Sequence, residues 1–171
     1  MMSFYKVGLG LITIGFCLSL VIIHLSNGVE GEYIGTEKQI TTDTSAQLEP
    51  AIFGDRIVWS DERNGNWDIY MYNLNTSTET QITTDTSAQW GPAIYGDRIV
   101  WRDGRNGNAD IYMYNLSTST ETQITTNTSR QYEPVIHGDR IVWQDIRNGN
   151  WDIYMYDLNT STETQITNDS S

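Results

Sequence analysis

Cysteine is nearly absent from this chain of 171 residues, and its absence excludes whole classes of chemistry. The one cysteine, Cys17, lies inside an apolar run near the amino terminus, so the rest of the chain carries no thiol. Such a chain can form neither an internal disulfide bond nor a metal site built from cysteine. The sequence therefore predicts a fold held by packing and hydrogen bonds, with no resident cofactor.

Basic residues and histidines are also scarce. The chain has 10 Lys and Arg against 22 Asp and Glu, which gives a formal net charge of −12. Binding to nucleic acid needs clustered basic side chains, so nucleic acid is excluded as a partner. Beyond the apolar run the single histidine is His137, which occupies a position held by Phe53 and Tyr95 elsewhere in the chain. Packing of a ring explains it, and we expect no catalytic residue and no enzyme activity.

One long apolar run stands near the amino terminus. It extends from Val7 to Leu25 and follows Lys6, which is the layout of a signal peptide or a signal-anchor helix over residues 1–28. A cleaved signal core has about 7 to 15 apolar residues and a membrane-spanning helix about 20, so the run is compatible with both cleavage and retention. Either outcome predicts a secreted or cell-surface protein, attached to the membrane if the segment is retained.

The rest of the chain is dominated by an internal repeat with a period of 42 residues. The first copy reads QITTDTSAQLEPAIFGDRIVWSDERNGNWDIYMYNLNTSTET, and the later copies are nearly identical to it. The copies span residues 39–80, 81–122 and 123–164, and a fourth begins at Gln165. A repeat of this length is typical of solenoids and propellers.

Each copy predicts four short strands joined by tight turns and no helix. Gly54-Asp55 and Asn64-Gly65 supply residues that tolerate the backbone of tight hairpins. The strands expected in the first copy are Ala51–Phe53, Arg56–Trp59, Asp68–Leu74 and Glu79–Thr83. Strands such as RIVW and DIYMYNL are apolar on both faces, so each sheet must be covered on both sides. Propeller blades satisfy this requirement, and a solenoid is the alternative.

The conserved positions of the repeat resemble a known family. They are the proline of the first strand, the Gly-Asp turn, the tryptophan of the second strand, the RNGN turn, the DIYMY strand and the closing QIT. Over residues 33–171 this pattern is similar to the TolB-type propeller repeat, and more closely to repeats of archaeal cell-surface proteins of the methanogen type. The resemblance implies an all-β fold with three four-stranded antiparallel blades after the amino-terminal hydrophobic helix. It implies no single activity, because propellers of this kind include binding proteins, scaffolds and enzymes.

Three blades are fewer than the four to eight that usually close a ring. A segment around Tyr33 to Thr41, which begins inside a spacer of residues 29–38, resembles a lone outer strand without its blade. We therefore expect an open arc with adhesive end faces. Two or more chains could close a ring as a homo-oligomer, and the chain could also be a truncated propeller without an independent role.

The loop between the second and third strands is a candidate calcium site. Its oxygen-bearing side chains are closely spaced in all three copies, and the candidate ligands are Asp61, Asp68, Asp103, Asp110, Asp145 and Asp152. In the alternative interpretation these side chains cap their own turn, and Arg63, Arg105 and Arg147 neutralise them.

The positions that differ between copies indicate a candidate binding face. Most lie in the loop that enters each blade or in the loop between its second and third strands, which a propeller places on one face. The residues we select are Leu48, Trp67, Trp90, Arg102, Arg130, Tyr132, Glu133 and Trp151. Aromatic side chains beside charged ones suit contact with a protein or a carbohydrate, although neutral drift in loops gives the same pattern.

These observations favour a non-enzymatic cell-surface or secreted module for binding, adhesion or envelope organisation. A polysaccharide lyase or hydrolase built on a propeller is the alternative, and it needs a unique polar cluster near the propeller axis. Because each candidate carboxylate recurs in the same surroundings, no acid and base with different environments stand out.

Overall fold

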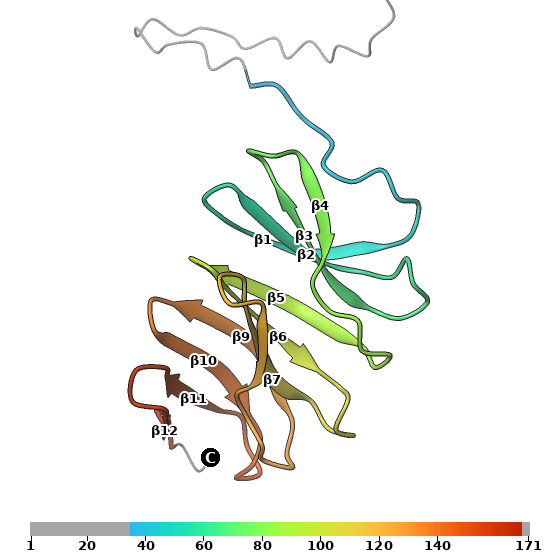
Figure 1. Ribbon diagram of the computed structural model, residues 1–171. Coiled ribbons are helices and arrows are strands. Elements are labelled where there is room, and N and C mark those ends of the chain that lie inside the picture. Colours follow the sequence, from blue (N-terminus) through green and yellow to red (C-terminus); the bar gives the residue numbers. More distant parts are fainter. Residues whose placement is uncertain (1–34, 169–171) are drawn as a thin grey trace, which may run out of the picture. The chain divides into compact units, whose positions relative to one another are not determined.

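The computed structural model describes residues 35–168 and shows three four-stranded antiparallel sheets there, with no helix among these residues (Figure 1). The chain divides into residues 1–38 and a compact unit of residues 39–171, which contains all the sheets. No helix within residues 35–168 could span a membrane. The expected amino-terminal helix and Cys17 lie outside the described residues, as does the spacer up to residue 34.

Each repeat forms one sheet, whose strands follow the order of the sequence, so we call each sheet a blade. The first blade contains β1 (Gln47–Phe53), β2 (Arg56–Asp61), β3 (Asp68–Asn73) and β4 (Thr78–Gln81). The second blade contains β5 (Gln89–Tyr95), β6 (Arg98–Asp103), β7 (Asp110–Asn115) and β8 (Thr120–Gln123). The third blade contains β9 (Gln131–His137), β10 (Arg140–Asp145), β11 (Asp152–Asp157) and β12 (Thr162–Gln165).

The predicted count of four strands per repeat is confirmed, and their boundaries shift for physical reasons. β1 begins at Gln47 rather than after Pro50, because a β-bulge between Leu48 and Ala51 lets pairing with β2 continue past the proline. The Gly54-Asp55 turn is where we expected it, and Gly54 has a φ of 56°, which favours glycine. The third and fourth strands are shorter than expected and end at Asn73 and Gln81.

The expected outer strand before the first blade is not formed in its described part. Residues 35–43 adopt no strand. A lone strand needs a neighbouring sheet edge for its hydrogen bonds, and the described chain has no blade in front of the first one to supply that edge.

Successive blades pack face to face. β5 contacts β1, β2 and β3 of the first blade, and β9 contacts β5, β6 and β7 of the second. The first strands of the three blades are therefore neighbours, although they pair with no strand of another blade. The second blade is covered on both faces, as the sequence predicted, whereas the first and third blades are each covered by a neighbouring blade on one face.

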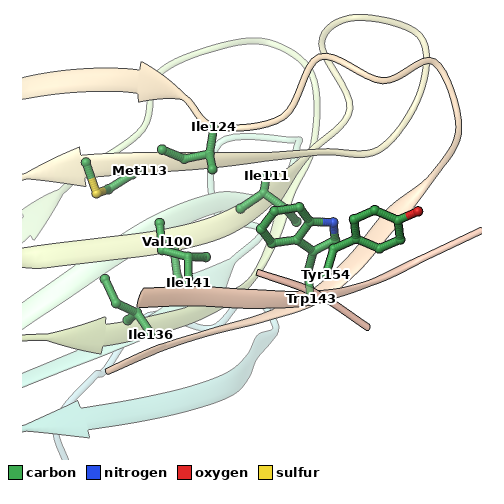
Figure 2. Close-up of a cluster of buried hydrophobic side chains, with 8 residues drawn as sticks. All are labelled: Val100, Ile111, Met113, Ile124, Ile136, Ile141, Trp143 and Tyr154. Carbon is green, nitrogen blue, oxygen red and sulfur yellow. The ribbon is translucent and has the colours of Figure 1, made fainter. Parts of the chain in front are cut away.

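The interface between the second and third blades shows this packing (Figure 2). The second blade contributes the apolar side chains of Val100, Ile111, Met113 and Ile124. The third blade contributes Ile136, Ile141, Trp143 and Tyr154. An equivalent cluster joins the first and second blades, where Val58 and Ile69 meet Ile94, Ile99, Trp101 and Tyr112. Two clusters built from equivalent positions thus hold three blades together.

A buried Trp–Asp–Arg unit fixes the end of the second strand in every blade. In the first blade the Trp59 indole N–H donates to Oδ2 of Asp61 over 2.8 Å, and the Arg63 backbone N–H donates to Oδ1 over 3.0 Å. The Arg63 guanidinium pairs with Asp61 at 2.6 Å and lies 4.2 Å from the centre of the Tyr70 ring. The same contacts recur at Trp101, Asp103 and Arg105 and at Trp143, Asp145 and Arg147.

Polar contacts cross each blade interface at both ends of the strands. At one end Arg56 donates to the carbonyl of Gly96 over 3.0 Å, and Arg98 donates to that of Gly138 over 3.2 Å. At the other end the Gln89 backbone N–H donates to the carbonyl of Trp67, as Gln131 does to that of Ala109, both over 2.8 Å. The two interfaces therefore share one set of contacts.

Acid should destabilise the blades through their buried aspartates. Burial raises the pKa of Asp145, but hydrogen bonds from Arg147 and Trp143 outweigh it and hold that pKa below the ordinary value. Asp61 behaves in the same way. A carboxyl with a lowered pKa stabilises the fold above its unfolded pKa of about 4, and this stability is lost as the pH falls further. We expect the melting temperature to drop steadily between about pH 5 and pH 2.5.

The Asp145→Asn variant separates this effect from general acid sensitivity. Its free energy of unfolding at pH 7 should be lower than that of the wild type by about 1 to 3 kcal/mol, because an amide cannot form an ion pair with the guanidinium of Arg147. Its melting temperature should then change less with pH than that of the wild type. An unchanged pH dependence in this variant would contradict the assignment.

Truncation of Ile94 should loosen the interface between the first two blades. Ile94 is buried there against Val58 and Ile69. We expect Ile94→Ala to lower the free energy of unfolding, measured with urea, by about 2 to 5 kcal/mol, and Ile94→Val to lower it by about 0.5 to 1.5 kcal/mol. Equal effects of the two variants would show that the site is not packed as described.

Candidate functional site

A cleft of about 400 Å³ opens where the first strands of the three blades meet. Its walls come from β1, β5, β6, β9 and β10 and from the loop that precedes β11. The residues that line it are Glu49, Trp90, Gly91, Arg102, Tyr132, Glu133, Pro134, Gln144 and Trp151. The cleft therefore draws on all three copies of the repeat, and most of its side chains sit at positions that differ between copies.

A row of aromatic rings with an arginine inside it forms one side of the cleft. The Arg102 guanidinium carbon lies 4.6 Å from the centre of the Trp90 ring and 4.7 Å from that of Tyr132. Tyr132 in turn packs against Trp151, with ring centres 5.5 Å apart and an interplanar angle of 51°. We call Trp90, Arg102, Tyr132 and Trp151 the aromatic row. Cation–π attraction on both faces holds the arginine in place.

Strand pairing explains why these four side chains meet. Trp90 on β5 is the direct partner of Arg102 on β6, so both lie on the same face of the second blade. Tyr132 on β9 occupies in the third blade the position that Trp90 has in the second. Face-to-face packing of the two blades then brings Tyr132 to the other side of the guanidinium.

Two glutamates face the same cleft from bulges in the first strands. Oε2 of Glu49 accepts a hydrogen bond from the Gly91 backbone N–H over 2.8 Å, and Oε2 of Glu133 accepts one from the Gln144 amide over 2.5 Å. Both glutamates have a positive φ, 55° at Glu49 and 53° at Glu133, which is uncommon for a residue with a side chain. The second blade places Gly91 at this position. Each glutamate keeps further acceptor capacity for a ligand, because a carboxylate has about four lone-pair sites.

Most residues of the predicted binding face lie together in one cleft. Trp90, Arg102, Tyr132, Glu133 and Trp151 all line the cleft. Three predicted residues do not: Leu48, Trp67 and Arg130. Leu48 and Trp67 belong to the first blade, which contributes only Glu49 to this cleft.

Sequence reasoning did not select four of the lining residues. Glu49, Gly91 and Gln144 stand at positions that differ between copies, so that difference could have identified them. Pro134 is identical in all copies, and no signal in the sequence distinguished it.

A second cleft, of about 370 Å³, lies among the Gly-Asp turns at the other end of the strands. It is lined by groups that already bond to one another across the blade interface. Asp97 illustrates this: hydrogen bonds from Ser117 and Arg56 hold its pKa below the ordinary value. Its Gly-Asp turns and Arg98 recur in every copy, so blade packing explains these contacts.

The six aspartates suggested for calcium have hydrogen-bond donors around them. Asp61, Asp103 and Asp145 form the Trp–Asp–Arg units described above. Asp68 shows the pattern of the other three: its Oδ2 accepts hydrogen bonds from Asn64 over 2.9 Å and from Gln81 over 3.0 Å. Among residues 35–168 no group of three or more Asp, Glu, His or Cys side chains is placed to hold a metal ion. The loops thus satisfy their own polar groups, as the alternative interpretation proposed.

His137 lies away from the cleft and packs as a ring. Its centre is 4.6 Å from that of Tyr95, which itself lies 4.7 Å from the ring of Phe53. The three residues occupy the same position in successive blades. This stack agrees with the packing role that the sequence suggested.

Comparison with solved structures shows the same fold in longer proteins. A putative TolB from Agrobacterium tumefaciens matches with a TM-score of 0.64 and 17% identity, over 74% of this chain and 50% of that one. TolB from Acinetobacter baumannii matches with a TM-score of 0.63 and 23% identity, over 75% of this chain and 34% of that one. The chain therefore spans half or less of these relatives.

Proteins with other roles share the fold as well. A structure from a nidogen/laminin complex matches with a TM-score of 0.55 and 15% identity, over 74% of this chain and 49% of that one. Peptidases such as the tricorn protease also match, and this chain covers 12% of that protein. At these identities the likeness concerns the fold alone. The suggested kinship with archaeal cell-surface repeat proteins finds no support among these matches.

No curated protein matches the sequence. The family model of the TolB beta propeller domain, however, matches residues 33–171, which include all three blades. Together with the four-stranded sheets of residues 47–165, this match identifies the fold expected from the repeat. The chain belongs to the TolB beta propeller domain family.

Proposed function

We propose that this chain is a non-enzymatic binding module that holds a segment of a partner protein in the cleft between its blades. The observation that carries the proposal is the aromatic row. It assembles side chains that differ between the copies into one continuous surface from the second and third blades.

The composition of the row suits a protein ligand. Tryptophan, tyrosine and arginine are the residues that most often dominate the energy of protein interfaces. Trp151 exposes 49% of its surface, so a ligand that covers it would remove much apolar area from water. A protein segment with an apolar side chain beside a basic one would fit, because Glu49 and Glu133 lie next to the rings. The net charge of −12 would favour the approach of such a segment.

The site is also held ready for binding. Three members of the row stand on strands, and Arg102 is fixed between two rings. A rigid binding surface loses less conformational entropy when the ligand arrives. A structure from a nidogen/laminin complex has the same fold, so the fold is compatible with a protein partner.

A carbohydrate is the second candidate ligand. The exposed ring of Trp151 offers a flat apolar face, and the neighbouring carboxylate of Glu133 can accept hydrogen bonds from hydroxyl groups. The aromatic row would then act as a stacking platform for a sugar ring.

The proposed location is the cell surface or the exterior of the cell. It is supported by the apolar run from Val7 to Leu25, which has the composition of an export signal. Membrane attachment through this run would keep the cleft close to the envelope and available to partners outside the cell.

Substitution of Trp151 should distinguish the cleft from the rest of the surface. The chain would be probed with a displayed library of random peptides and, separately, with an array of glycans. For any probe that the wild type retains, we expect Trp151→Ala to weaken binding at least tenfold, about 1.4 kcal/mol. A retained peptide supports the protein ligand, and a retained glycan supports the carbohydrate.

Trp67→Ala is the matched control. It removes the same side chain from the equivalent position of the first blade, outside the cleft. Its binding should stay within about twofold of the wild type, well below the tenfold loss at Trp151. Equal losses in the two variants, or no retained probe of either class, would contradict the proposal.

A further inference from the structure

We infer that two copies of this chain associate head to tail, with the outer face of the third blade of each packed on the outer face of the first blade of the other. The association would form a six-bladed ring. It does not depend on the cleft or on its ligand. The two interfaces inside the chain specify what a third interface of the same kind requires.

Both outer faces expose apolar side chains whose equivalents are buried in the internal interfaces. Ile94 and Ile136 are 7% and 5% exposed because a preceding blade covers them, whereas their equivalent Ile52 in the first blade is 63% exposed. The opposite face of the third blade shows the same contrast. Ile69 and Ile111 are fully buried under a following blade, while their equivalent Ile153 is exposed, as are Val135 and Ile166.

The arginine–aspartate contact of each internal interface also has one half on each outer face. The arginine stands on the third blade and the Gly-Asp turn on the first. Arg56 and Arg98 each reach the Gly-Asp turn of the following blade. Their equivalent in the third blade, Arg140, has a side chain that is 69% exposed and lies 3.8 Å from Asp157 of its own blade. It has the length and charge to reach the Gly54-Asp55 turn of a second copy.

The carboxylate of Asp55 is prepared to receive that arginine. In Asp97 and Asp139, Oδ2 accepts a bond from the same blade and Oδ1 accepts the arginine of the preceding blade. In Asp55, Oδ2 accepts a hydrogen bond from Asn75 in the same manner, over 2.6 Å. Its Oδ1 corresponds to the atom that binds arginine in the other two blades. A second copy would supply Arg140 at this atom.

Ring stacking adds a third complementary pair. Phe53, Tyr95 and His137 stack in order across the two internal interfaces. Phe53 stands at the outer face of the first blade and His137 at that of the third. Head-to-tail contact would place the His137 ring of one copy against Phe53 of the other and so continue the stack.

Two copies of the three described blades fit one closed ring. Closed propellers usually have four to eight blades, and six is the only multiple of three in that range. A head-to-tail interface that closes after two copies gives a twofold ring with two identical contacts and no exposed end face. Because each copy carries a net charge of −12, association should be measured at about 0.15 M salt or above, where repulsion is screened.

Light scattering coupled to size exclusion should detect the pair. We expect a mass twice that of the denatured chain, measured over a range of protein concentrations up to about 100 μM, well above the micromolar dissociation constants of weak specific complexes. Ile52→Asp should weaken association at least tenfold without unfolding the chain, because this side chain is exposed in the single copy. Thr80→Asp, an exposed substitution on the outer strand β4, is the matched control and should leave the mass unchanged.

Charge exchange provides the decisive test. Arg140→Asp and Asp55→Arg should each weaken association at least tenfold, and the double variant should restore it, since the pair is then reversed. A monomer at every concentration would overturn the inference and leave the outer faces to a different partner. A mass above twice that of the chain would overturn the closed ring. Association that resists Ile52→Asp, or that the charge exchange fails to restore, would overturn this interface.

Discussion

Every blade in this protein depends on apolar packing against a neighbouring blade. The central strands carry isoleucine, valine, tryptophan and tyrosine in runs that leave no face for water. A single blade would expose too much apolar surface to be stable alone, so its stability comes from its neighbours. The arginine that crosses each interface serves this dependence directly, because it ties one blade to the Gly-Asp turn of the next.

The proposed binding cleft lies where the copies stop being identical. A repeated residue meets the same surroundings in every blade, so it suits packing better than the recognition of one ligand. The aromatic row shows the opposite case. At the position of Arg102 the other blades carry Ser60 and Gln144, and at the position of Trp90 they carry Leu48 and Tyr132. A few substitutions in a rigid frame have therefore produced one distinct surface.

The sequence was sufficient for the fold because its signals were local and repeated. Glycine-containing turns, a period of 42 residues and strands apolar on both faces led to four-stranded blades without knowledge of any contact. The residues that line the cleft were selected only in part. Trp90, Arg102 and Tyr132 were selected because they vary, but their stacking depends on the pairing of β5 with β6 and on the approach of β9. The bulges at Glu49 and Glu133 depend on strand register, which the sequence alone did not reveal.

The likeness of the two blade interfaces also affects how the chain must fold. Strands β2, β6 and β10 begin with the same four residues, Arg-Ile-Val-Trp, so a forming sheet meets several partners of nearly equal quality. Neighbouring repeats of such similarity are prone to mispairing and to exchange of strands between chains. Short connections between consecutive blades oppose this, since they bring the correct neighbour into contact first. Chain connectivity, more than side-chain specificity, thus keeps the blades in order.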